Sequence, residues 1–326
     1  MTTSPEDYTE YRPLMFSIAY RMTGSVSEAE DIVQEAFLRA AKAAKAAAGG
    51  KDAESPKAYL ATITTRLAID HMRSARVRRE SYVGTWLPEP LLAGPLKAGQ
   101  LLADDAPGPA ERAEMSDSLS MAFLVLLESL SPPERAVFLL REVFGYGYDE
   151  IAQAIGKTEA ACRQIFARAR RRIDEGRPRF DTSRAEGEEL TGLFLSVARG
   201  GDLTALLDRL APDVQFYGDS GGLGETTFIA PVTGRDRVAE LVRVQVDRTV
   251  QLGASLRGAW VNGQPGILAC DGDGGLIAVI ALDVLDGQVQ AIRAVANPEK
   301  LRHLGPVSSA WHRRSSGVTP AGPPAS

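Results

Sequence analysis

The feature that constrains this chain most is a glycine, Gly156, between two short amphipathic segments. Residues 148–155 and 159–173 each repeat apolar side chains at helical spacing. Gly156 can adopt the positive φ that ends the first helix, and Thr158 suits the N-cap of the second, with Glu159 in its first turn. Two helices joined by a tight glycine turn predict a helix-turn-helix.

The second helix of this motif is strongly basic. Against the single acid Glu159 it carries Lys157, Arg163, Arg168, Arg170, Arg171 and Arg172. Such a helix is typical of one that lies against DNA phosphates. The alternative is a solvated last turn, where cations complement the helix dipole. Spacing and charge together favour DNA binding, with candidate residues Thr158, Glu159, Arg163, Arg168 and Arg171.

Length and composition limit the remaining possibilities. A chain of 326 residues suggests two or three domains, and a net charge of −5 means that the basic patches are local. The two cysteines, Cys162 and Cys270, form no CxxC motif, which favours a reducing compartment and argues against structural zinc. We expect no metal and no cofactor. We also expect no membrane contact, because the N-terminus is acidic and no apolar run reaches about 20 residues. The expected location is cytoplasmic.

Two capped helices precede the motif. Ser25 to Glu28 forms a capping box, and the helix behind it has a buried stripe opposite a polar face. That polar face carries Asp31, Gln34, Glu35 and Arg39. Ser55 and Pro56 begin the next helix. Its basic residues are Arg66, Arg73, Arg76, Arg78 and Arg79, and Tyr82 follows them. Basic residues with a neighbouring aromatic suit nucleic acid whose bases can stack.

Prolines and glycines interrupt the helical pattern over 81–115. A linker of this length is unusual inside a compact domain, so we expect it to be functional or partly disordered. A helix resumes over 118–130, and a second capping box, Ser131 to Glu134, leads into the helix-turn-helix.

Four segments occur in the order found in bacterial sigma factors. They are DIVQEAFLRA (31–40), YLATITTRLAIDHMRSARVRR (59–79), LSPPERAVFLLREVFGYGYDEIA (130–152) and the arginine-rich final helix. Over about its first 180 residues the chain resembles the extracytoplasmic-function (ECF) type. The resemblance implies that the polar face at 31–39 docks on the β′ clamp helices of core RNA polymerase, with the β flap as a further partner. It also implies that the basic helix at 66–79 melts and reads the −10 promoter element, that the helix-turn-helix reads the −35 element, and that the linker threads the polymerase cleft.

A different pattern begins near residue 186. Helices are expected at 190–199, 203–210 and 235–246, and strands at 214–217, 226–232, 254–261, 266–270, 276–285 and 289–294. Helices followed by a curled antiparallel sheet predict an α+β cone. This part resembles the SnoaL-like branch of the NTF2 superfamily.

Three segments resemble the branch of ECF factors that carries such a domain. YVGTWLPEPLL (82–92) is similar to its linker opening, NPEKL (297–301) to its C-terminal signature, and DSGGLG (219–224) to a DGGGK-like loop. Leu223 replaces the lysine of that loop. The regulatory candidates are Asp219, Gly221, Gly222, Asn297, Pro298, Glu299, Lys300 and Leu301.

We therefore expect a multidomain protein with two all-α sigma domains, 1–80 and 116–180, joined by the linker 81–115. A SnoaL-like regulatory cone, 186–305, and a disordered tail, 306–326, follow. The expected function is an ECF sigma factor regulated by its own cone through intramolecular contact, so that no separate anti-sigma factor is required.

Two alternatives stay open: a helix-turn-helix regulator with a ligand-binding domain, and an enzyme that uses the cone. No catalytic residue is proposed, because Asp213, Asp219, Asp271 and Asp273 lie at strand ends or turns, where aspartate is ordinary. No His–Asp pair can be proposed, since His303 and His312 lie at the far C-terminal end of the chain.

Overall fold

The computed structural model describes residues 5–46, 55–80, 82–92, 118–176, 182–201, 203–223, 230–251 and 253–308. The chain forms two compact units. Unit 1 comprises Met1–Ser81 and Leu91–Phe180, and unit 2 comprises Tyr82–Pro90 and Asp181–Ser326. A nine-residue piece of the expected linker therefore belongs to the C-terminal unit.

Unit 1 is helical. Its elements are α1 (Pro5–Thr23), α2 (Val26–Ala46), α3 (Pro56–Glu80), α5 (Met121–Leu127), α6 (Pro132–Phe138), the π-helical turn η1 (Leu139–Val143), α7 (Tyr148–Ile155) and α8 (Glu159–Gly176). Their apolar faces share one core that runs from Met15 in α1 to Ile173 in α8.

The helix starts of unit 1 follow the caps expected from the sequence. The Ser25 hydroxyl accepts from Glu28 N at 3.2 Å, the Ser55 hydroxyl from Ala58 N at 3.3 Å, and Glu134 accepts from Ser131 N at 3.0 Å. Each bond satisfies a backbone or side-chain group that a helix end would otherwise leave without a partner. These predicted boundaries are confirmed.

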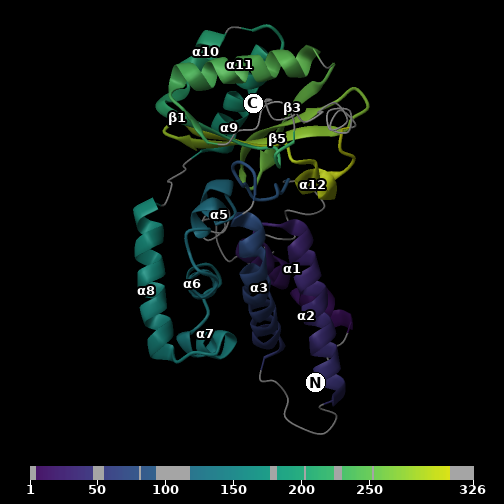
Figure 1. The fold of residues 1–326 in the computed structure, drawn as a ribbon, viewed down its shortest axis with the longest axis vertical. Coiled ribbons are helices and arrows are strands. Elements are labelled where there is room, and N and C mark those ends of the chain that lie inside the picture. Colours follow the sequence, from purple (N-terminus) through teal and green to yellow (C-terminus); the bar gives the residue numbers. More distant parts are fainter. Residues whose placement is uncertain are drawn as a thin grey trace, which may run out of the picture. The chain divides into compact units, whose positions relative to one another are not determined.

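Unit 2 packs helices on a mixed sheet (Figure 1). The helices are α9 (Arg184–Val197), α10 (Leu203–Leu207), α11 (Arg235–Gln251), α12 (Pro298–Leu301) and the short 3-10 helix η2 (Arg302–Leu304). The strands are β1 (Leu210–Asp219), β2 (Val232–Thr233), β3 (Ser255–Val261), β4 (Gln264–Cys270), β5 (Leu276–Leu285) and β6 (Gln288–Val295), in the order β2-β1-β6-β5-β4-β3. Val214, Phe216, Leu282 and Ile292 form a core with apolar residues of α9 and α11. The predicted α+β class is confirmed.

Three expectations about unit 2 were wrong in detail. The sheet is mixed, because β1 pairs with β6 in parallel while β3 to β6 form the expected antiparallel meander. Helix α10 ends at Leu207 and Leu210 already begins β1. Of the strand expected at 226–232, residues 226–229 lie outside the described residues, and β2 begins at Val232. The ordered chain also passes 305, since Ser308 N donates to Leu276 O at 2.9 Å.

Candidate functional site

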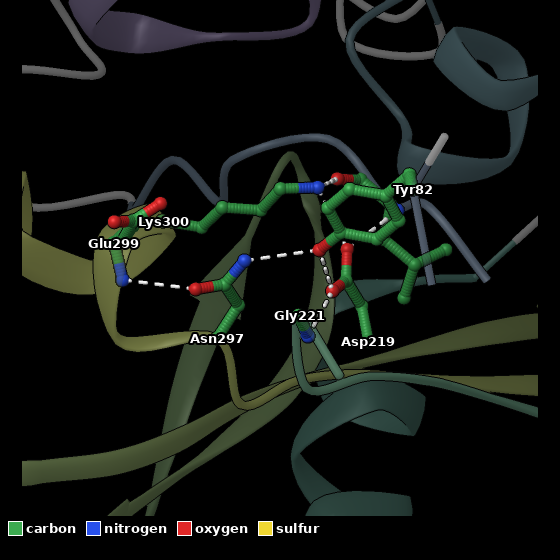
Figure 2. A network of polar contacts seen from close by, with 7 residues as sticks. Tyr82, Asp219, Gly221, Asn297, Glu299 and Lys300 are labelled. Carbon is green, nitrogen blue, oxygen red and sulfur yellow. Dashed lines mark hydrogen bonds and ion pairs between the residues drawn. The ribbon is translucent and has the colours of Figure 1, made fainter. Parts of the chain in front are cut away.

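The segment Tyr82–Pro90, which we call the strap, is held by the C-terminal end of β1 (Figure 2). Asp219, only 1% exposed, accepts a hydrogen bond from the Tyr82 hydroxyl and another from Leu87 N at 2.8 Å. Gly221 N donates to the same carboxylate at 3.1 Å and Lys300 Nζ at 2.7 Å. An ionised carboxylate only accepts hydrogen bonds, so these donors satisfy a charge that burial would otherwise penalise.

Lys300 supplies the opposite charge from α12. Its Nζ donates to Leu87 O at 2.6 Å as well as to Asp219. The ammonium also lies 4.8 Å from the centre of the Tyr82 ring and 4.4 Å from that of Trp86. Cation–π contact is strongest where water is excluded, and Lys300 is buried. The ion pair Asp219–Lys300 therefore binds both backbone and side chains of the strap.

Asn297 joins the strap to the start of α12. Its Oδ1 accepts from Glu299 N at 3.0 Å, which caps the helix, and its Nδ2 donates to the Tyr82 hydroxyl at 2.9 Å. Burial, and then the charge of Asp219, raise the pKa of Tyr82 well above its usual range. The hydroxyl thus stays protonated and can donate to Asp219 while it accepts from Asn297.

The glycines of the turn after β1 leave space for this network. Gly221 has φ 64° and Gly222 has φ 75°, a region that favours glycine. A Cβ atom at Gly221 would lie 2.6 Å from Asn297 Nδ2, and one at Gly222 would lie 3.1 Å from Val83 Cβ. Both glycines are therefore needed where the turn approaches Asn297 and the strap.

The sequence did not reveal what residues 297–304 hold. Lys300 and His303 both contact the strap, His303 through Nε2 to Pro90 O at 2.8 Å and through Nδ1 to Glu89 Oε2 at 3.7 Å. Leu301 is fully buried, Pro298 begins α12, and Leu223 is exposed. The resemblance of residues 297–301 to a family signature marked part of this segment, but it did not indicate which residues Lys300 and His303 would contact.

Tyr82 has contacts that the sequence did not indicate. The structure assigns this side chain to unit 2, where its hydroxyl contacts Asp219 and Asn297. Tyr82 comes two residues after the end of α3 in the sequence, but it belongs to unit 2.

The cone also contains a buried ion pair on its sheet. Arg293 Nε lies 2.8 Å from Asp283 Oδ2 and its guanidinium lies 4.4 Å from the Tyr217 ring centre. Burial raises the pKa of Asp283. The pair links β5 to β6 and, through Tyr217, to β1. Asp271 has the expected turn role, because its Oδ1 accepts from Gly275 N at 2.7 Å and from Asp273 N at 3.1 Å.

The polar face of α2 is largely exposed within unit 1. Asp31 and Gln34 are exposed, and Glu35 pairs with Arg39 at 2.7 Å. Leu38 lies on the same face and is 47% exposed. A single exposed leucine is ordinary on a protein surface, so the docking role of this face stays a prediction.

The helix-turn-helix has the expected geometry. Gly156 has φ 67°, and Thr158 Oγ1 accepts from Ala161 N at 3.2 Å. Glu159 pairs with Arg163 at 2.8 Å. Exposed Arg168 and Arg171 lie further along α8.

Two further arginines of this region have roles that the sequence did not indicate. Arg141 and Arg163 both lie 5.0 Å from the Tyr148 ring centre, so Arg141 joins the basic surface. Arg172 instead donates to Ser129 O at 2.9 Å, a contact within the fold.

The basic helix α3 divides into a bonded part and an exposed part. Arg66 donates to Ala154 O at 2.9 Å and to Gln153 O at 2.6 Å, both in α7. Arg73 is exposed and pairs only weakly with Asp70 at 3.3 Å. The side chains of Arg76, Arg78 and Arg79 lie outside the described residues.

Within the described ranges, no group of three or more His, Cys, Asp or Glu side chains is placed to hold a metal ion. Across the same residues, each helix is too short or too polar to cross a membrane.

Comparison with known proteins identifies the class. Residues 8–78 match the family model of sigma-70 region 2, and residues 120–173 match that of sigma-70 region 4. The chain is thus a sigma factor of the sigma-70 type.

Its relatives define the family more closely. The chain is 34% identical to the ECF RNA polymerase sigma factor SigJ of Mycobacterium tuberculosis, over 95% of this chain and 99% of the relative. It is 33% identical to the probable ECF RNA polymerase sigma factor SigI of the same species, over 90% and 93%. The crystal structure of SigJ superposes with a TM-score of 0.69 at 32% identity, covering 94% of this chain and all of that one. The chain belongs to the ECF RNA polymerase sigma factor family.

Proposed function

We propose that this sigma factor is regulated by its own cone through the strap. The observation that carries the proposal is the buried Asp219–Lys300 pair, which binds Tyr82 and Leu87 of the segment between the two sigma regions. A domain fused to the chain acts at high effective concentration, so contacts that would be weak between separate molecules are sufficient. By binding the strap, the cone limits the conformations that the linker can adopt when the sigma regions bind polymerase.

The contacts between the cone and the strap both restrain the linker and position it. While the strap is bound, its residues cannot adopt another path, which restrains the linker. The same contacts give the linker one defined conformation, which positions it for productive binding. An anti-sigma factor is then not required, since the restraint is built into the chain.

We propose roles for the remaining surfaces from the match to sigma-70 regions 2 and 4. The α2 face with Asp31, Gln34, Glu35 and Arg39 docks on the β′ clamp helices, and region 4 contacts the β flap. The basic end of α3 opens the −10 element, and α8 reads the −35 element through Arg163 with phosphate contacts from Arg168 and Arg171. The protein works in the cytoplasm with core polymerase and has no catalytic residues of its own, because phosphodiester chemistry belongs to the polymerase.

The strap proposal is tested by transcription in vitro with purified core polymerase. Tyr82→Phe removes only the hydroxyl that bridges Asp219 and Asn297. Tyr217→Phe is the matched control, because that hydroxyl bonds to Gln215 within the cone. We expect Tyr82→Phe to change promoter-specific transcript yield and Tyr217→Phe to leave it unchanged. Equal yields from all three proteins contradict the proposal.

The same assay separates the alternatives. A helix-turn-helix regulator that is not itself a sigma factor gives no promoter-specific transcript with core polymerase alone. An enzyme that uses the cone gives transcripts that are insensitive to Tyr82→Phe.

A further inference from the structure

Two arginines of the helix-turn-helix domain share one aromatic ring, that of Tyr148. Arg141 of η1 and Arg163 of α8 each place the guanidinium carbon 5.0 Å from the centre of this ring. A cation within about 6 Å of a ring centre is attracted by the negative face of the ring. Tyr148 is the first residue of α7, so its ring joins the turn before the motif to the first and second helices.

The ring of Tyr148 is held from the core of unit 1. Phe166 of α8 meets it nearly edge-on, with ring centres 6.2 Å apart and ring planes at 74°. Phe166 is buried and stacks on buried Phe138 of α6 at 6.2 Å. Edge-to-face and offset-stacked pairs are the favoured aromatic geometries. The orientation of the Tyr148 ring is therefore set by core packing before any DNA is bound.

A carboxylate holds Arg163 on α8 itself. Its Nη2 donates to Glu159 Oε2 at 2.8 Å, and the two side chains are 56% and 47% exposed. An exposed pair of this kind, one helical turn apart, contributes little by itself and leaves both long side chains mobile. The ring of Tyr148 adds a second contact of a different kind. Together the two contacts limit the guanidinium to fewer orientations while it stays accessible.

The shared ring also gathers positive charge. Arg141 is exposed and is tied to the turn, because its Nη1 donates to Tyr146 O at 3.0 Å. Since Arg141 and Arg163 contact the same ring, their charges lie within about one Debye length of each other, about 10 Å at 0.1 M salt. Such a pair repels itself and is stabilised by an anion. Nucleic acid is the partner whose chemistry fits this surface.

We propose that Tyr148 is a positioning residue for promoter recognition, whose ring, together with the Glu159 carboxylate, holds the Arg163 guanidinium in the orientation in which it meets the bases. This inference rests on the proposed assignment of Arg163 to the −35 element. Tyr148 then acts through Arg163, and it needs no contact with the bases itself.

The benefit of this arrangement is preorganisation. An arginine reads a base through two hydrogen bonds whose directions are fixed by its planar group, so its orientation matters. A side chain that is already ordered loses less conformational entropy on binding. Non-specific contact with phosphates depends on charge more than on orientation. Loss of the ring should therefore affect binding to the preferred sequence more than binding to random DNA.

The test measures specificity in the complete holoenzyme, formed from the full-length protein and core polymerase. Specific DNA is a promoter selected by the unmodified holoenzyme from a library randomised at the −35 element, and the reference is the same duplex with that element scrambled. The readout is the ratio of the two affinities. A variant that is merely less stable lowers the active fraction, which affects both affinities equally and leaves their ratio unchanged.

The decisive variant is Tyr148→Leu, which keeps an apolar side chain against Phe166 but removes the aromatic face. We expect it to lower the affinity ratio roughly two- to five-fold, as the strength of an exposed cation–π contact implies. Tyr148→Phe keeps the ring and should preserve the ratio. Arg170→Ala is the control, because that exposed arginine lies over a different ring, 6.0 Å from the centre of Phe166. It should leave the ratio unchanged.

A double variant shows whether Tyr148 acts through Arg163. In an Arg163→Ala background, Tyr148→Leu should have no further effect on the affinity ratio. An equal loss with and without Arg163 would overturn the proposal. So would an unchanged ratio in Tyr148→Leu, or a loss in Tyr148→Phe as large as that in Tyr148→Leu, which would assign the effect to the hydroxyl.

Arg163→Ala alone separates this inference from the function on which it rests. If that variant leaves the ratio unchanged, the assignment of Arg163 to the −35 element fails, and the positioning role of Tyr148 fails with it. If it lowers the ratio and Tyr148→Leu does not, only the positioning role fails. Neither result bears on the strap, which the effect of Tyr82→Phe on transcription measures.

Discussion

Replacing Asp219 by alanine should release the strap and destabilise unit 2. The variant leaves the Lys300 ammonium buried without its carboxylate, and removal of one partner from a buried pair costs about 3–5 kcal/mol. It also removes the acceptor used by Leu87 N and the Tyr82 hydroxyl. We therefore expect the free energy of unfolding to fall by about 3–5 kcal/mol. With a urea m-value of about 2 kcal/mol/M, the midpoint should move down by about 2 M.

The emission of Trp86 is a suitable probe, because its ring contacts the Lys300 ammonium. Urea titrations would use the full-length protein with Trp260→Phe and Trp311→Phe, which leaves Trp86 as the single tryptophan of the three. Asp273→Ala is the control, since this exposed turn residue should change stability by no more than about 0.5 kcal/mol.

A double variant tests the origin of the effect. Lys300→Met removes the charge that Asp219→Ala leaves without a partner. The combined variant should therefore lose less than the sum of the two single losses, with a coupling of about 0.5–3 kcal/mol. Strict additivity, or an unchanged Trp86 transition in Asp219→Ala, would refute the reasoning that this pair holds the strap.

The other predictions concern the partner surfaces and pH. Changing Asp31 and Gln34 to alanine together should weaken binding to core polymerase with the fold intact, and unchanged retention in a pull-down would contradict the docking assignment. Arg163→Ala should lose roughly 1–3 kcal/mol on the preferred promoter and relax its sequence preference, whereas Arg171→Ala should weaken binding to all sequences and reduce its salt dependence. Equal effects of both variants on specific and random DNA would mean that a different face of α8 meets the bases. The pKa of Tyr82 is raised in the fold, so its contribution is complete at neutral pH and should decline as pH rises above about 10, where the unfolded phenol ionises. Tyr82→Phe should flatten that part of the stability profile, and an unchanged profile would contradict the assignment.

Local features of the fold were predictable from the sequence because they depend on neighbouring residues. The caps at Ser25, Ser55, Ser131 and Thr158 each need a backbone N–H or a glutamate within three residues, and the chain spacing alone provides it. The turn at Gly156 is local in the same sense.

Pairings across the chain were not predictable in this way. Alternation of apolar residues indicates that β1 and β6 are strands, but it carries no information on which strand lies beside which, or in which direction. The resemblance of residues 297–301 to a family signature marked that segment as important without showing that Lys300 would lie against Asp219 and Leu87. Arg66 was expected on DNA because its charge was visible in the sequence, whereas the carbonyls of α7 that it binds were not.

The strap has a physical property that suits regulation. The strap is held by a buried ion pair. Release of the strap costs less free energy than mutation of one partner, because release returns both charges to water, whereas mutation leaves one charge buried without its partner. The attraction between Asp219 and Lys300 is largely offset by the hydration that the two groups lose on burial, so the strap is bound specifically but without great net stability. An apolar contact of the same area would lack this compensation and would oppose opening in proportion to the area exposed. Polar contacts therefore allow the strap to be bound in one defined conformation and still be released when polymerase and promoter offer better partners.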